Sequence, residues 1–205
     1  LFLSLRDKFY SRIKPIIIKS QKELSSPIVL EAQLNQATNN PINLRSEIEI
    51  LIRKNIIRCF HLNLSKYGTE RYFMLEIDYR DQLQRMKDEK VDFFLNFVIS
   101  KNHISPTIST EMLKSNNFTQ DHITYLVNKK VLLLNIGKGQ QYVVSVPSSE
   151  PIVQSVSKGR RSLVSYLNRQ KDKIVEKLNV ERQNIEGSIF YAEFHCQELL
   201  GIGVF

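Results

Sequence analysis

Cysteine and histidine are scarce in this chain of 205 residues, which excludes most metal sites. The two cysteines, Cys59 and Cys196, lie far apart within apolar patterns. This predicts buried free thiols in a reducing compartment, with a disulfide between them as the alternative. The four histidines are widely separated and none stands at metal-ligand spacing from a cysteine, so each is interpreted as a structural or surface residue. We therefore predict no bound metal and no cofactor.

Long apolar runs are absent as well. No stretch approaches the roughly 18 apolar residues that a membrane span needs, and two polar residues interrupt the most apolar segment, residues 92–99. The leading residues 1–5 are too short for the apolar core of a signal peptide. With 42% apolar and 24% charged residues, the composition is that of a globular protein of two or three small domains. We expect no membrane partner.

A catalytic constellation is also missing. Phosphoryl transfer needs metal-holding acids and a positioned base, but the chain has no Gly-rich loop before a strand lysine, no His-Arg-Asp and no Asp-Phe-Gly. The glycines at Gly137 and Gly139 fit a hairpin tip better than a phosphate loop. We predict that the protein is not an enzyme, has no catalytic residues and takes no small-molecule substrate.

The strongest positive signal is a pattern that recurs after 75 residues. It consists of Ile48, Leu51, Ile52, Ile56 and Ile57, then of Ile123, Leu126, Val127, Val131 and Leu132. In each copy the first three residues form one face of a helix, and the last two begin a strand. A glycine-containing tip and a returning run rich in β-branched and aromatic residues follow each time. A helix that leads into a β-hairpin is the second half of a winged helix.

A weaker third copy appears at an offset of 148 residues. Its apolar positions are Cys196, Leu199, Leu200, Val204 and Phe205. We therefore predict a mostly helical α+β protein of three tandem winged-helix modules, the third lacking a complete wing. The expected modules are residues 1–79, 80–147 and 148–205.

Apolar spacing, capping residues and prolines also place the other helices along the chain. The expected helices are residues 2–13, 28–36, 44–54, a long one that begins near residue 79 and continues to 100, one that starts at residues 105–107, one opened by residues 119–122, then 152–168, 171–178, and one within 188–200. Asn43 is the expected cap of the helix at 44–54. Two prolines between residues 147 and 151 mark the clearest boundary.

The net charge of +8 is concentrated in two segments. Residues 1–22 and residues 158–173 each hold six basic residues against one acid, a net +5 apiece, which leaves −2 for the other residues. Clustered positive charge on an otherwise near-neutral protein is typical of a polyanion binder. The alternative is a solvated helix face.

The segment 152–177 carries the sharpest functional signal, because basic residues at helical spacing oppose apolar residues such as Val156 and Leu163. Gly159 would let a backbone or a phosphate approach closely. The predicted DNA contacts are Lys158, Arg160, Arg161, Arg169, Lys171, Lys173 and Lys177, with Arg53, Lys54 and Lys66 in the first module, where Arg45 and Arg71 are further candidates. Five neutralised phosphates would give a log–log salt slope of about −4.5.

Several short motifs resemble, in order and spacing, the serine/threonine-protein kinase 19 family. They are Pro27-Ile28-Val29-Leu30-Glu31-Ala32-Gln33-Leu34, Ser145-Val146-Pro147, Lys158-Gly159-Arg160, Arg169-Gln170-Lys171-Asp172-Lys173-Ile174 and Phe194-His195-Cys196-Gln197-Glu198-Leu199-Leu200-Gly201. The resemblance runs from about Pro27 to Gly201. The sequence departs from the family pattern in lacking the third wing and in an insert at residues 19–24.

The resemblance implies three tandem winged helices, a nuclear location and binding of double-stranded DNA. It also implies a role in transcription-coupled DNA repair or transcription, with nuclear repair or transcription proteins as partners. The alternative is a scaffold of a nuclear complex that docks proteins through its winged helices. The acids Glu47 and Glu49 favour that alternative for the first module, since carboxylates repel phosphates.

Overall fold

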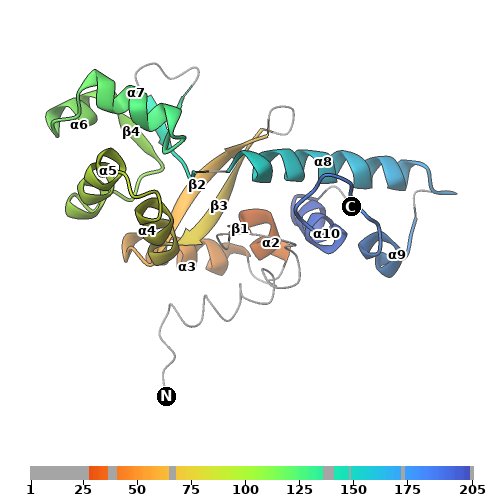
Figure 1. The fold of residues 1–205 in the computed structure, drawn as a ribbon. Coiled ribbons are helices and arrows are strands. Elements are labelled where there is room, and N and C mark those ends of the chain that lie inside the picture. Colours follow the sequence, from red (N-terminus) through yellow and green to blue (C-terminus); the bar gives the residue numbers. More distant parts are fainter. Residues whose placement is uncertain are drawn as a thin grey trace.

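Two small antiparallel sheets surrounded by helices form the protein, an α+β fold that is mostly helical, as predicted (Figure 1). The computed structural model describes residues 28–36, 41–64, 68–135, 141–147, 149–171 and 174–203. The helix predicted at residues 2–13, the glycine tip at 137–139 and the positions of Val204 and Phe205 lie outside the described residues.

The first sheet contains the first predicted hairpin. Its elements are β1 (Val29–Leu30), α2 (Glu31–Gln36), α3 (Pro41–Arg53), β2 (Ile57–Asn63) and β3 (Thr69–Leu75). The strand order is β1-β3-β2, and β2 pairs with β3 from Ile57 opposite Leu75 to Asn63 opposite Thr69. The hairpin prediction is thus confirmed. The helix expected from residue 28 is shorter, because Val29 and Leu30 pair with β3 as a strand instead.

The second sheet repeats this arrangement. Its elements are β4 (Thr107–Ser109), α6 (Thr110–Ser115), α7 (Gln120–Asn128), β5 (Leu132–Leu134) and β6 (Gln141–Val144), with the strand order β4-β6-β5. Both sheets therefore follow the same sequence of strand, helix, helix, strand and strand. Ile48 and Leu51 in α3, like Ile123 and Leu126 in α7, are buried. The repeat of 75 residues thus corresponds to a repeated set of elements.

The prediction of a single helix between residues 79 and 100 is wrong. Two helices occupy this region, α4 (Glu76–Gln84) and α5 (Glu89–Ser100). Lys87 between them has a φ of 50°, a left-handed conformation that ends a helix. Asp88 then caps α5 by accepting hydrogen bonds from the backbone N–H groups of Lys90 and Val91.

The helix expected to start at residues 105–107 begins later. Residues 107–109 form β4, which pairs with β6, and α6 follows. Ser109 is its N-cap, with its hydroxyl 3.1 Å from the backbone nitrogen of Met112. Thr119 caps α7 in the same way, as predicted for the helix opened by residues 119–122.

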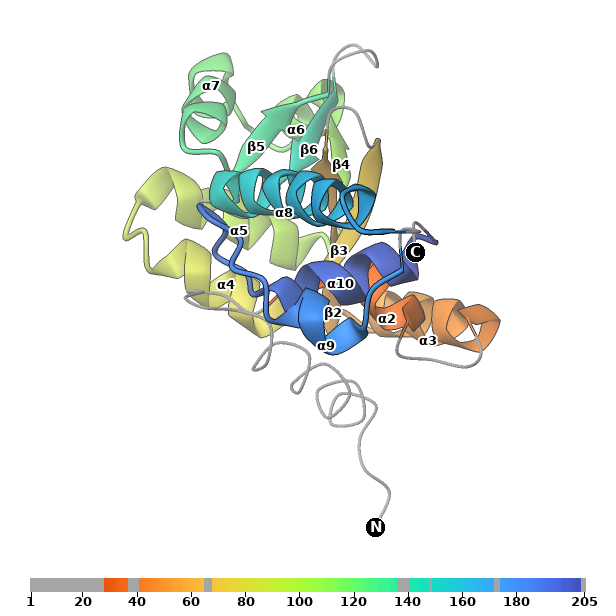
Figure 2. The ribbon, with the colours of Figure 1, turned by 90° about the vertical axis from the view of Figure 1, so that its right-hand side faces the viewer.

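The last part of the described chain is helical, with α8 (Glu150–Asn168), α9 (Lys177–Glu181) and α10 (Ala192–Gly201). The helices expected at 152–168 and within 188–200 are confirmed. The one expected at 171–178 is wrong, because residues 174–176 are not helical and α9 starts only at Lys177. Both views show α8 next to α10, and α10 lies beside α2 (Figures 1 and 2).

A single cluster of buried side chains connects the three predicted modules. It includes Tyr72 of β3, Phe94 of α5, Val156 of α8 and Phe190, all at most 1% exposed. Smaller clusters lie beneath α3 and between α8 and α10. The modules therefore share apolar core, as expected for units too small to bury much surface alone. Among the described segments, no helix has the length and apolar character needed to cross a bilayer.

Candidate nucleic-acid interface

Helix α8, the longest among the described residues, presents a line of basic side chains to solvent. Lys158, Arg161 and Arg169 are exposed, and Ser165 lies between the two arginines on the same side. The intervals of three, four and four residues place these positions along one face of a helix. We call Lys158, Arg161 and Arg169 the α8 stripe. Lys171, also exposed, follows shortly after the end of the helix.

The guanidinium groups of the stripe lie along their own helix. Arg161 Nε donates to the carbonyl of Ser157 at 3.3 Å, and Arg169 Nε donates to the carbonyl of Ser165 at 3.2 Å. Within the described residues, no carboxylate forms an ion pair with a stripe side chain. An arginine has five N–H donors in a planar fork, so each fork keeps further donors that can reach an anion.

The opposite face of α8 is buried. Val156 and Leu163 are fully enclosed, which confirms the predicted apolar face. Gly159 does allow a close approach, but its neighbour is the ring of His195 rather than a phosphate. A Cβ added to Gly159 would lie 2.1 Å from that ring. The imidazole is held by a 2.9 Å hydrogen bond between its Nε2 and the hydroxyl of Ser188.

Arg160 was predicted to contact DNA, and this is wrong. It is 1% exposed and forms ion pairs with Glu70 of β3 and Glu198 of α10. The sequence contained the signal, because Arg160 follows Val156 by four residues and precedes Leu163 by three, which is the spacing of the buried face. Arg160 was predicted as a contact because it belongs to the basic segment 158–173 and to the motif Lys158-Gly159-Arg160, although helical spacing does not place it on the side of Arg161.

Arg160, Glu70 and Glu198 form a charged cluster in which the neighbouring charges affect the pKa of Arg160 and of Glu198. Burial raises the pKa of Glu198 to about 7, although the hydrogen bond and charge of Arg160 oppose the rise. Burial lowers the pKa of Arg160, but the hydrogen bonds and charges of Glu198 and Glu70 outweigh it, so the net direction is upward. The arginine is therefore the charged centre of the group, and Glu198 is the member that titrates near neutrality.

The raised pKa of Glu198 makes stability depend on pH. The folded protein binds a proton on the Glu198 carboxyl group more tightly than the unfolded chain does. The stabilisation from this proton is therefore complete below the unfolded pKa of 4.5 and is lost as the pH rises through about 7. We expect the free energy of unfolding of the wild type, relative to Glu198→Gln, to fall by about 2 kcal/mol between pH 5 and pH 7. Urea unfolding followed by circular dichroism at each pH measures the difference.

The comparison with Glu198→Gln matters because other groups titrate in this range. Burial lowers the pKa of both His61 and His103, so their contribution to stability is lost as the pH falls, in the opposite direction. Subtracting the free energy of unfolding of Glu198→Gln from that of the wild type cancels the contribution of these histidines. A difference between the two proteins that stays constant from pH 5 to pH 7 would contradict the titration of Glu198.

The comparison with known families agrees with the sequence motifs. The profile of a family described as inactive serine-threonine protein kinase 19 matches residues 4–189, which is most of the chain. The chain belongs to this family. The description of the family as inactive confirms the prediction that the protein is not an enzyme. A search of curated protein sequences returned no match.

Two basic candidates of the first module lie away from the α8 stripe. Arg53 and Lys54 are exposed at the end of α3, just before β2 starts. Glu70, which contacts Arg160 of α8, lies opposite Leu62, five residues further along β2 or about 17 Å away. The two cationic regions therefore lie toward opposite ends of the same hairpin.

The remaining basic candidates differ in their surroundings. Arg71 of β3 forms ion pairs with Glu31 at 3.2 Å and with Glu49 at 2.9 Å, and its contact with DNA stays a prediction. Arg45 is exposed on α3. Lys177 begins α9. Lys66 and Lys173 lie outside the described residues.

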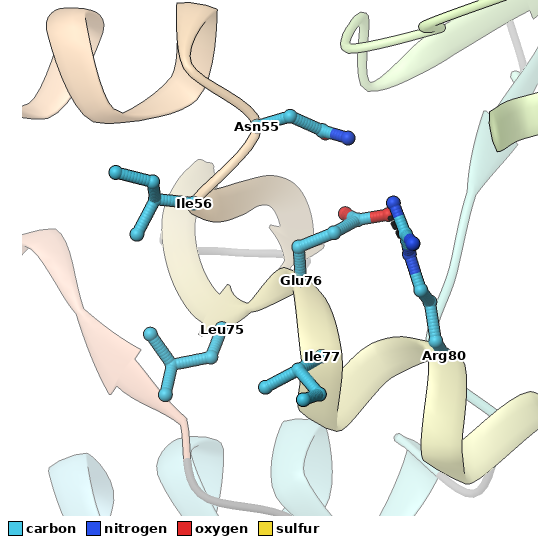
Figure 3. Close-up of a pocket in the computed structure, with 6 residues that line it drawn as sticks. All are labelled: Asn55, Ile56, Leu75, Glu76, Ile77 and Arg80. Atoms are coloured by element: carbon cyan, nitrogen blue, oxygen red, sulfur yellow. Dashed lines mark hydrogen bonds and ion pairs between the residues drawn. The ribbon is translucent and has the colours of Figure 1, made fainter.

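A pocket of about 250 Å³ lies between the end of α3 and the start of α4 (Figure 3). Its carboxylate, Glu76, already accepts hydrogen bonds from Arg58 and Arg80. The described residues contain no group of His, Cys, Asp and Glu side chains able to hold a metal ion. Cys59 and Cys196 are both buried and are not joined by a disulfide, as predicted. Burial raises the pKa of Cys59 despite the neighbouring Arg71. Nothing in these groups suits a nucleophile or a general base.

Proposed function

We propose that this protein is a non-catalytic, tandem winged-helix DNA-binding protein that holds double-stranded DNA against the α8 stripe. The observation that carries the proposal is the line formed by Lys158, Arg161 and Arg169, exposed on one face of a 19-residue helix and without a described carboxylate partner. Cations arranged in this way neutralise phosphates and release counterions, which supplies affinity that does not depend on base sequence.

The dimensions of the stripe suit a sugar–phosphate backbone. Lys158 and Arg169 are eleven residues apart, which corresponds to about 16 Å along a helix. Phosphates of one strand follow each other at about 3.4 Å along the duplex axis, so the stripe can span several of them. The opposite face of α8 is anchored in the apolar core through Val156 and Leu163, which leaves the cationic face as the side that a partner can reach.

The winged-helix part of the proposal is supported by the two sheets. Each follows the order of strand, helix, helix, strand and strand, with the last strand at the centre of the sheet. Helices α8, α9 and α10 would be the third module, without a wing hairpin in its described part. The proposed nuclear location, and the proposed role in transcription-coupled repair or transcription, rest on the family resemblance.

A direct binding titration tests the proposal. We expect the wild-type protein to saturate a fluorescently labelled duplex of about 20 base pairs, with a Kd of about 10⁻⁶ M or tighter at physiological salt. Fluorescence anisotropy measures the Kd, and an unlabelled duplex of unrelated sequence should compete equally. Failure to bind at protein concentrations of about 10⁻⁴ M would contradict the proposal, because even nonspecific binders reach that affinity.

A second function, docking of proteins, is favoured by the exposed face of α3. Glu47 is exposed there, and Ile50 is 45% exposed although it is a large apolar residue. An acidic and apolar face suits a protein partner better than phosphates. Capture of nuclear proteins that persists after nuclease treatment and is lost in Ile50→Asp would support this role for the first module. The two functions are compatible, since they use different helices.

A further inference from the structure

The inner face of α8 is fixed by charge as well as by apolar contact. Arg160 links α8 to two elements at once, to Glu70 of β3 and to Glu198 of α10. A further polar contact holds α8 at another position, where Ser155 accepts a hydrogen bond from the backbone N–H of Ile189 at 3.1 Å. Such directional bonds specify one rotation of the helix about its axis, whereas apolar contacts alone tolerate sliding.

The rotation of α8 decides where the stripe points. Arg160 is adjacent to Arg161 and two residues from Lys158, yet its side chain is 1% exposed while theirs are exposed. Successive residues of a helix are about 100° apart, so a rotation by one position would carry the stripe away from its present side. The bonds of Arg160 therefore set the direction of the cations next to it in the sequence.

We propose that Arg160 is a positioning residue for DNA binding, whose ion pairs with Glu70 and Glu198 hold α8 so that Lys158, Arg161 and Arg169 face one duplex. The inference rests on the proposed function, since it assigns a role in DNA binding to a residue that does not touch DNA. It differs from a phosphate contact in one measurable respect. A phosphate contact is lost whenever the arginine is removed, whereas a positioning role can be taken over by another well-packed pair.

The test uses a single and a double variant of the whole chain. Arg160→Met leaves Glu198 buried without its main partner, and we expect duplex affinity to fall about tenfold or more. In Arg160→Met with Glu198→Met, an apolar pair replaces the fully buried ion pair, an exchange that proteins often tolerate, and Glu70, whose side chain is 18% exposed, keeps access to water. We expect its duplex affinity to return to within about threefold of the wild type, although the arginine is absent.

A matched control separates positioning from general loss of stability. Arg58 also forms a buried ion pair, with Glu76 at 2.7 Å, but within the first sheet and α4 rather than on α8. Arg58→Met should lower the melting temperature as Arg160→Met does, while the folded protein keeps its duplex affinity. Equal loss of affinity in both single variants would overturn the positioning role. The positioning role would also be overturned if the double variant folds but binds duplex DNA as weakly as Arg160→Met does.

Labelling of the wild type covers the case in which the double variant does not fold. Phenylglyoxal reacts with accessible guanidinium groups, and mass spectrometry locates the product. We expect Arg161 and Arg169 to react in the free protein and to be protected by duplex DNA, and Arg160 to be unreactive in both states. Reaction of Arg160 that DNA suppresses would overturn the inference. Absence of protection at Arg161 and Arg169 would instead contradict the proposed function, so the two failures are distinguishable.

Discussion

Reversing the charges of Lys158 and Arg161 together should weaken duplex binding about a hundredfold. Each reversal removes one attraction to a phosphate and adds one repulsion, so the pair of substitutions changes four charge interactions. At contact distance in water, after screening by salt, each is worth about 0.7 kcal/mol. Four of them sum to about 3 kcal/mol, which corresponds to a rise in Kd of about a hundredfold. Fluorescence anisotropy of Lys158→Glu with Arg161→Glu measures it.

A control with the same change in net charge isolates the location of the effect. Lys101 and Lys114 are exposed in the second sheet region, at the end of α5 and on α6. Reversing both alters the total charge equally, but we expect less than about a threefold loss of affinity, since charges beyond the Debye length are screened. Equal weakening in both double variants would mean that net charge, and not the α8 stripe, determines binding.

Replacing Gly159 with alanine should destabilise the protein by about 4 kcal/mol. Alanine is favoured over glycine inside a helix by about 1 kcal/mol, so an unobstructed site would gain stability. Here the added Cβ would lie 2.1 Å from the ring of His195, which packs against Phe190 and Phe194 and bonds to Ser188. Overpacking costs about 3 kcal/mol, and losing the buried hydrogen bond about 2 kcal/mol more. The sum outweighs the helix preference.

Chemical denaturation of Gly159→Ala, followed by circular dichroism, measures this change. Ser162→Ala is the matched control, because Ser162 is exposed on the same helix and should change stability by less than about 0.5 kcal/mol. If Gly159→Ala were as stable as the wild type, the packing of α10 against α8 through His195 would be wrong. The same result would also weaken the argument for a fixed rotation of α8.

Local periodicity was sufficient to predict both hairpins and the long helix α8. These elements depend on apolar spacing that the sequence shows directly, as with Ile48 and Leu51. The break between α4 and α5 was missed, since a polar run is compatible with an exposed helix and with a turn. The capping signal of Asp88 was nevertheless present before Val91. Strand β4 was missed because its pairing partner, β6, is more than 30 residues away.

Only part of the candidate site could be predicted, because local spacing shows which side chains share a helix face but not which distant residues they contact. The exposed cations Lys158, Arg161 and Arg169 follow from spacing on one helix. The burial of Arg160 also follows from spacing, but its partners Glu70 and Glu198 stand 90 and 38 residues away, and no local pattern connects them. The apolar face of α8 was visible in the sequence, whereas the close contact of Gly159 with His195 depends on the packing of α10.

The salt dependence of duplex binding tests the central claim most directly. Removing Arg160 from the predicted contacts leaves Lys158, Arg161, Arg169 and Lys171 as the described, exposed cations of this region. Neutralising four phosphates predicts that log K falls with log salt at a slope of about −3.6, and that the slope of Lys158→Glu with Arg161→Glu is shallower by about 2. A wild-type slope near zero, or one that these substitutions leave unchanged, would contradict binding through the α8 stripe.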